Sequence, residues 1–229
     1  MKKITISSLL LVVVLCAVFC KDKDANLSAS DKNTDLSAQG DIVLVAPKKS
    51  GGKPIMTLLE TRKTERVFSP KELPKQMLSD LMWAAAGRSR NNSEFRTIPT
   101  SRNQQEMDVY AFLSSGIYKY DHKNHTLVLF KSGDLRETAT AARQEFAKTA
   151  PVNIVIVSNF DKIDGDAEYK AVTAGFHAGA ISQNIYLYCT SVGLNTVVRK
   201  WLDYDLLSKT LELNPNQRVT AAQTVGFGN

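Results

Sequence analysis

Three cations lie within five residues of this chain, in a segment (residues 62–68) that reads Arg-Lys-Thr-Glu-Arg-Val-Phe. The guanidinium fork of arginine matches phosphate oxygens in a bidentate manner, and a threonine hydroxyl can add a further hydrogen bond. On an extended strand or an open first turn, Arg62, Lys63, Thr64 and Arg66 could face a single anion. Taken alone, such a run of charge is more often a solvated surface.

A second polar segment, residues 99–105, reads Pro-Thr-Ser-Arg-Asn-Gln-Gln and precedes an expected strand. Its hydroxyls, guanidinium and amides could offer hydrogen bonds to a flat heterocycle. By composition it could equally be a solvated loop. The candidate binding residues in this loop are Thr100, Ser101, Arg102, Asn103 and Gln105.

The third segment is a helix of small and apolar residues that continues to Gly193. A helix of this kind usually belongs to the core, which is the alternative to a functional reading. Gly193 lets the backbone turn sharply, so main-chain groups of residues 195–198 could lie against a planar ligand. The candidates after this turn are Asn195, Thr196 and Val197.

Several helices are predicted from apolar spacing and capping residues. Pro74 begins one helix and Gly87 is expected as its left-handed cap, while the apolar and small residues of 171–192 step by three and four until Gly193. Asp134 is expected to cap a helix that Pro151 ends, and a short helix is expected near Asp203 or Asp205.

Runs of β-branched and aromatic residues predict the strands. Residues 116–121 and 125–130 form an expected hairpin, and 109–113 and 218–225 are expected strands. The continuous apolar run 152–157 is typical of a central strand buried on both faces. Residues 41–45 could form a short edge strand.

The N-terminus predicts export, because Met1-Lys2-Lys3 precedes an apolar run that ends at Phe19. We expect a signal peptide at 1–20, a flexible tether at 21–50 and a folded domain at 51–229. The product would be periplasmic or a membrane-anchored lipoprotein. Cleavage after Cys20 fits slightly better than a lipid anchor on Cys20, which stays open.

Composition narrows the function classes. A net charge of +6 over 229 residues is modest and comes without a nucleic-acid-binding motif, so we expect no nucleic-acid partner. Removal of the signal would leave Cys189 as the remaining cysteine, which excludes an intramolecular disulfide. The three histidines, His122, His125 and His177, show no metal-binding spacing, and we expect no metal.

The three segments, in order over roughly residues 58–226, resemble the FMN-dependent nitroreductase family. Residues 62–68 resemble its Arg-Arg-Ser-x-Arg-x-Phe phosphate motif, and residues 99–105 its Pro-Ser-Ser-x-Asn-x-Gln loop. Residues 179–194 resemble its Gly-x-x-x-Gln-Asn-x-x-Leu helix and the Gly-Leu-Gly-Ser turn. Within the family, residues 83–87 and 116–121 resemble the SagB-type (thiazole/oxazole-forming) dehydrogenases, which oxidise azoline rings.

The resemblance implies an α+β fold with an antiparallel-rich central sheet flanked by helices, in an intertwined homodimer with FMN at the subunit interface. The chain departs from the family pattern in two places: the basic residue after the final Val-Gly is missing, and Asn195 replaces the second glycine of the turn. The FMN phosphate would then rely on Arg62, Thr64 and Arg66, with Arg199 as a further candidate.

The implied activity is transfer of two electrons between a reduced donor and a small acceptor such as a nitroaromatic or quinone, or oxidation of a small or peptide substrate. An exported enzyme would need a donor other than cytoplasmic NAD(P)H. The alternative is a non-catalytic exported protein that binds or senses FMN. No catalytic side chain is assigned from the sequence.

Overall fold

The computed structural model describes residues 40–90 and 93–229. The expected signal peptide, Cys20 and the first part of the expected tether lie outside the described residues. Within the described part, no helix is long and apolar enough to cross a membrane, and no group of three His, Cys, Asp or Glu side chains is placed to hold a metal ion.

The described residues form one antiparallel sheet in the strand order β1-β4-β3-β2-β5-β7-β6. The expected α+β class and antiparallel sheet are confirmed. The strands are β1 (Ile42–Val43), β2 (Met107–Leu113), β3 (Gly116–Asp121), β4 (Thr126–Ser132), β5 (Val152–Asn159), β6 (Asn195–Arg199) and β7 (Gln217–Gly226).

Strand β5 lies between β2 and β7 in the sheet, as its apolar sequence predicts. Seven of its eight residues are buried because helices cover both faces. Along β2, Val109 and Ala111 face one core cluster while Tyr110 and Phe112 face the other. This alternation of side chains between two cores fixes the register of the central strands.

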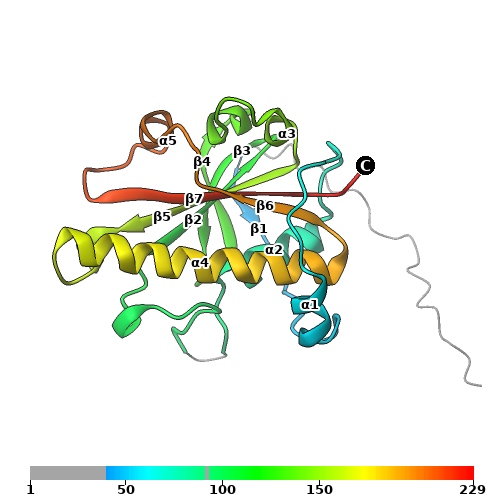
Figure 1. Cartoon of the computed structure of the whole chain (residues 1–229), viewed down its shortest axis with the longest axis horizontal. Helices are drawn as coiled ribbons and strands as arrows, with labels where there is room; N and C mark the ends of the chain where they lie inside the picture. The colour runs from blue at the N-terminus through cyan, green and yellow to red at the C-terminus, as the bar shows by residue number, and fades with distance from the viewer. Residues whose placement is uncertain (1–39, 91–92) are drawn as a thin grey trace, which may run out of the picture. The chain divides into compact units, whose positions relative to one another are not determined.

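Helices pack on both faces of the sheet, as Figure 1 shows, with α4 on one side and α3 and α5 on the other. On the first side α2 and α4 enclose the larger core. The helices are α1 (Ile55–Thr61), α2 (Lys75–Ala86), α3 (Glu145–Lys148), α4 (Ala167–Val192) and α5 (Tyr204–Thr210), with short 3-10 helices η1 (Ser101–Asn103), η2 (Arg136–Ala139) and η3 (Phe160–Lys162).

Helix α4 follows its predicted pattern closely. Ile181 and Ile185 are fully buried against the sheet, and Gly193 ends the helix at a φ of 75°, in the left-handed region. Cys189 is fully buried as a free thiol, and burial raises its pKa. Its environment is that of a small apolar core residue.

Two expected helix details are wrong. Gly87 caps α2 with a φ of −76° and extended backbone, so it is not a left-handed cap. The helix expected between residues 134 and 151 is broken into η2 and α3, because Arg143 has a positive φ of 67°. The Asp134 carboxylate binds the Arg136 side chain instead of capping a long helix.

The packed domain begins about ten residues earlier than the expected boundary at 51. Strand β1 pairs with β4, and the backbone amide of Leu44 donates to the carbonyl of His125 at 3.2 Å. Further along, the amide of Lys48 donates to the Asp80 carboxylate at 2.8 Å. These bonds anchor residues 42–48, part of the expected tether, to the sheet and to α2.

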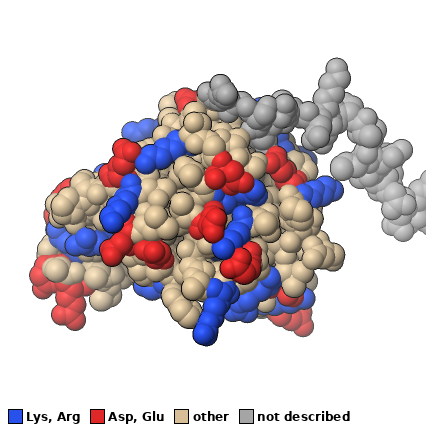
Figure 2. Space-filling model, turned by 90° about the horizontal axis from the view of Figure 1, so that it is seen from above, with Lys and Arg blue, Asp and Glu red and all other residues tan. Residues whose placement is uncertain are grey.

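Charges of both signs are interspersed on the face shown in Figure 2. On α3, the ammonium group of Lys148 lies 3.0 Å from Glu137 and 3.1 Å from Glu145. A nucleic-acid-binding surface usually gathers its cations into one patch or stripe, and this face has none.

Candidate functional site

The segment 62–68, which we call the strap, follows α1 and crosses α4 next to β6. The Arg62 guanidinium lies 4.9 Å from the centre of the Tyr186 ring, and the Thr64 hydroxyl lies 2.7 Å from the Tyr186 hydroxyl. The backbone amide of Val198 donates to that same hydroxyl at 3.2 Å. Tyr186 therefore joins the strap, α4 and β6 at one point.

The cations of the strap remain accessible. Lys63, Thr64 and Arg66 are exposed and Arg62 is half-buried. Lys63 pairs with Glu65, whereas Arg66 makes no hydrogen bond or ion pair with the described residues. Guanidinium groups held near a surface without a carboxylate partner are available to bind an anion.

A groove of about 720 Å³ runs beside the strap, between α4 and strands β6 and β7. Tyr186 and Val198 line it next to the strap, and Lys200 and Arg218 add two cations. Its α4 wall consists mainly of small residues: Ala167, Ala171, Ala174, Gly175, Ala178 and Gly179. The volume falls within the range of small-molecule and cofactor pockets.

Helix α4 anchors the loop 99–105 through His177. The backbone amide of Ser101 donates to Nε2 of His177 at 3.1 Å, and Nδ1 of His177 lies 2.5 Å from the Glu106 carboxylate. Arg102, Asn103 and Gln105 all have a positive φ, between 49° and 56°. This conformation is uncommon for residues other than glycine and persists where the surroundings impose it.

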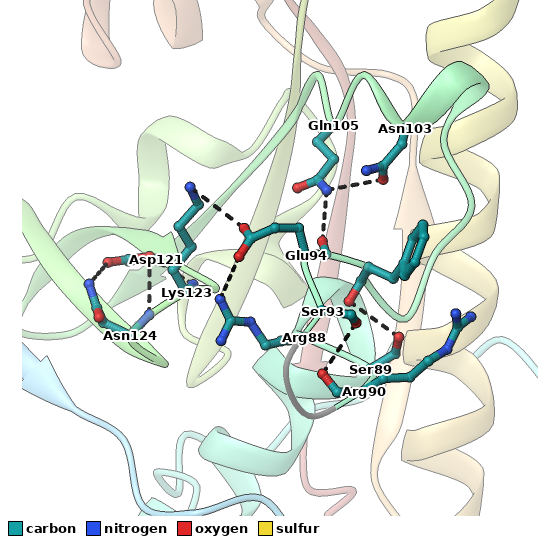
Figure 3. Close-up of polar contacts among 11 residues, drawn as sticks. Arg88, Ser89, Arg90, Ser93, Glu94, Asn103, Gln105, Asp121, Lys123 and Asn124 are labelled. Carbon is teal, nitrogen blue, oxygen red and sulfur yellow. Dashed lines mark hydrogen bonds and ion pairs between the residues drawn. The ribbon is translucent and has the colours of Figure 1, made fainter.

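Glu94 links the loop to the turn between β3 and β4, as Figure 3 shows. Its carboxylate lies 2.9 Å from Arg88 and 3.6 Å from Lys123, and its carbonyl accepts a hydrogen bond from the Gln105 amide at 2.7 Å. The Gln105 amide also donates to Asn103 at 3.0 Å. The outer end of the loop thus has several surface contacts.

The strap and the loop contact opposite flanks of α4. The strap meets the helix at position 186 and the loop meets it at position 177. Nine residues are two and a half turns, so these positions point about 180° apart and lie about 13.5 Å apart along the axis. One chain therefore does not bring its two predicted cofactor-binding segments together.

The three candidate residues of β6 all contact the strap. The Asn195 side chain donates to the Val67 carbonyl at 2.8 Å, and the Thr196 carbonyl accepts from the Glu65 amide at 3.1 Å, so both brace the strap. The Val197 side chain packs against Phe68 in a small core cluster.

Arg199 lies in a buried polar network on the α3 face of the sheet, whereas Arg62 and Thr64 contact Tyr186 of α4. Its guanidinium donates to the Ala139 carbonyl at 2.8 Å, to Gln144 at 2.6 Å and to Asn153 at 2.9 Å. Burial lowers the pKa of Arg199 to about 10. The structure therefore does not place this candidate phosphate ligand with Arg62 and Arg66.

Comparisons with known proteins identify the family of the chain. Residues 59–227 match the model of the Nitroreductase family. The chain belongs to the nitroreductase family. A crystal structure of a family protein from Ralstonia eutropha JMP134 is 35% identical, with a TM-score of 0.78, and the match covers 85% of this chain and 92% of that one.

Two further relatives are more distant. A nitroreductase-family protein from Methanocaldococcus jannaschii is 28% identical over 151 residues, which is 61% of this chain and 75% of the relative. The Escherichia coli microcin synthetase McbBCD complex has a chain of the same fold, at 19% identity and a TM-score of 0.64, covering 82% of this chain and 78% of that one. Membership of the nitroreductase family supports a flavin-type oxidoreductase.

The residues of the strap and the groove suit a flavin nucleotide. For a phosphate, the strap offers the exposed guanidinium of Arg66, unpaired among the described residues, and the half-buried guanidinium of Arg62. The adjoining groove has apolar walls and a cationic edge at Lys200 and Arg218, which matches a ligand with a flat ring system at one end and an anion at the other.

Three residues, namely Tyr186, His177 and Glu106, were not assigned to the site from the sequence. The contact between Thr64 and Tyr186 spans 122 positions, and that between Glu106 and His177 spans 71. Single-sequence periodicity identifies the buried side of α4 but carries no information on which distant loop meets each flank. The sequence carries one signal, the residue types of His177 and Tyr186, because polar side chains are unusual in a helix of small and apolar residues.

Replacing Arg199 tests whether this residue is structural. We expect Arg199→Met to lower the free energy of unfolding by at least about 2 kcal/mol, because the buried Ala139 carbonyl and the amide oxygens lose their donor. Urea denaturation measures the change. The exposed Lys209→Met is the control and should stay within about 0.5 kcal/mol of the wild type. A variant of unchanged stability with weakened flavin binding would instead return Arg199 to the cofactor site.

Proposed function

We propose that the protein is an FMN-dependent oxidoreductase that passes two electrons between a reduced donor and a small acceptor such as a nitroaromatic or a quinone. The observation that carries the proposal is the cluster of Arg62, Thr64 and Arg66 beside a groove of about 720 Å³. Family membership gives the oxidoreductase class, and the cluster gives the reason to favour a phosphate-bearing flavin.

In this proposal the strap holds the phosphate through Arg62, Thr64 and Arg66, with Lys63 adding charge. Thr100, Ser101, Asn103 and the neighbouring polar residues of the loop contact the ring system. Main-chain groups of residues 195–197 lie beside the ring. Bound FMN would supply the hydride chemistry, and the chain supplies binding, orientation and exclusion of water.

The substrate of the physiological reaction can also be proposed. Residues 83–87 and 116–121 favour the SagB-type branch, and so oxidation of a small or peptide substrate is an alternative to reduction of a nitroaromatic. The fold shared with a chain of the microcin synthetase complex is compatible with that branch. A non-catalytic protein that binds or senses FMN is the second candidate, favoured by Asn195 at a position where the family has glycine.

Loss of one strap guanidinium should weaken FMN binding. A charge-assisted hydrogen bond contributes roughly 1.5–3 kcal/mol, so we expect Arg62→Ala and Arg66→Ala each to raise the Kd for FMN at least about tenfold. Fluorescence titration of the apoprotein measures it. Arg143→Ala is the matched control, because Arg143 is exposed and lies between η2 and α3.

The same preparations separate the enzyme from the binding protein. Anaerobic mixing of the FMN-loaded wild type with candidate donors should bleach the flavin absorbance stoichiometrically, and an acceptor should restore it. A flavin that resists every donor favours the binding protein. Unchanged FMN affinity in both arginine variants would remove the phosphate assignment.

We further propose that the protein works as a homodimer whose cofactor site takes residues from both subunits. One chain holds the strap and the loop on opposite flanks of α4, so a second copy is the simplest source of the missing half. The outer side of α4 also carries exposed apolar residues, namely Tyr169, Val172 and Phe176. A contiguous apolar surface on a soluble protein commonly marks an interface.

Charge introduced on this surface should separate the subunits without unfolding the chain. Phe176 is 72% exposed, and we expect Phe176→Glu to give a monomer that retains FMN at least about tenfold less well. Leu206→Glu on α5 is the control. Sedimentation velocity reports the mass, and absorbance at the flavin band reports retention. Wild type that sediments as an FMN-saturated monomer at micromolar concentration contradicts the dimer.

We also propose that the protein is exported, as the apolar run after Lys2-Lys3 predicts. Mass spectrometry of the mature N-terminus decides the form. A start at Lys21 or later without lipid indicates a soluble exported protein, and a diacylated Cys20 indicates a lipoprotein. An intact Met1 in a cytoplasmic fraction would refute both.

A further inference from the structure

An ionisable pair, Glu106 and His177, is buried beneath the loop 99–105. The exposed fractions of the two residues are 0% and 3%, and Nδ1 of His177 lies 2.5 Å from Oε1 of Glu106. Their neighbours along the chain, Met107 and Ala174, belong to the larger core cluster, and the buried Arg96 interacts electrostatically with Glu106. Charged and polar groups are rarely placed in such a core unless they hydrogen-bond to each other.

The direction of the hydrogen bonds follows from the loop. The backbone amide of Ser101 lies 3.1 Å from Nε2 of His177, and an amide N–H can only donate. Nε2 must therefore be an acceptor, and the ring proton is on Nδ1, from which it is donated to Glu106. The carboxylate thereby fixes the tautomer that His177 presents to the loop.

The loop conformation requires an anchor. Arg102, Asn103 and Gln105 have φ values of 49°, 56° and 49°, in the left-handed region that side chains disfavour. The ion pair of Arg102 with Asp164 is 78% and 77% exposed, and exposed pairs contribute little. The bond to His177 is different because its acceptor is buried in the core.

We propose that Glu106 and His177 act as a positioning pair, holding the Ser101 amide so that the loop keeps the conformation in which it meets the flavin ring system. The pair acts on the flavin through the loop and does not touch the reacting atoms. The part that concerns the flavin rests on the proposed function, whereas the part that concerns the loop stands on the geometry of the chain alone.

The same three residue types can also activate a serine nucleophile, but the distances argue against that role. The Ser101 hydroxyl lies 3.5 Å from Nε2, and the Ser101 amide is closer at 3.1 Å. A neutral imidazole has one lone pair at Nε2, and the amide occupies it. His177 therefore fixes the backbone of residue 101 and is not free to take the proton of its hydroxyl.

Amide hydrogen exchange in the flavin-free protein tests the loop part. His177→Phe removes the acceptor, and exchange at residues 101–103 should become at least about tenfold faster. His177→Gln is the conservative variant, because its carbonyl can accept from Ser101 while its amide donates to Glu106, and it should restore slow exchange. Cys189→Ala is the control for a buried change on α4 away from the loop.

A measurement on the wild type keeps the test valid if His177→Phe does not fold. Long-range ¹H–¹⁵N NMR should show an unprotonated, acceptor-type Nε2 and a protonated Nδ1 on His177. A protonated Nε2, or unchanged exchange at residues 101–103 in folded His177→Phe, would overturn the positioning pair.

The flavin part has its own readout. With FMN bound, His177→Phe should change the shape of the visible flavin absorption band and weaken FMN binding, and His177→Gln should bring both back towards the wild type. Faster loop exchange with unaltered FMN affinity and band shape would overturn the link to the flavin. A wild type that binds no FMN but shows the expected exchange pattern would refute the proposed function while supporting the anchor.

Discussion

The rotation of α4 about its own axis determines where every other part of the site can lie. Ile181 and Ile185 are fully buried against the sheet, and this burial sets the rotation. A turn of the helix by one residue position, about 100°, would remove them from the core. With the rotation fixed, Tyr186 must face the strap and the groove, and His177 must face the loop. The two polar contacts are consequences of apolar packing.

Polar groups inside this fold are arranged to hold backbone segments in place. Arg199 donates to acceptors on η2, on β5 and at the start of α3, so one guanidinium ties irregular segments to the sheet. His177 and Asn184 do the equivalent work on the other face, where the Asn184 amide donates to the carbonyls of Ala84 and Thr97 at 3.1 and 3.2 Å. Burial of such groups is unfavourable unless they are hydrogen-bonded, so each anchor also specifies one arrangement of its loop.

The sequence predicts regular elements well where the apolar period is long. The central strand 152–157, the helix ending at Gly193 and the hairpin of β3 and β4 are confirmed because their patterns reflect burial directly. The helix expected after Asp134 is wrong because the local backbone at Arg143 and the Asp134–Arg136 contact override propensity. Arg199 was a candidate phosphate ligand because a sequence shows the charge of a residue but not where its side chain points. Side chains alternate along β6, and that of Arg199 lies on the α3 face of the sheet.

In the proposed dimer, the position of the small residues on α4 would let the groove and the subunit interface share one helix. The flank of α4 towards β6 and β7 carries small residues, and the space that larger side chains would fill is part of the groove. These residues are Ala171, Gly175, Ala178 and Gly179. Val172 and Phe176 lie further round the helix, and their larger side chains are exposed to solvent. A ligand and a second subunit can therefore use adjacent stripes of the same helix without competing for the same side chains. The strap and the loop flank these stripes on either side, so in the proposed dimer a second subunit bound along the outer stripe would complete the groove.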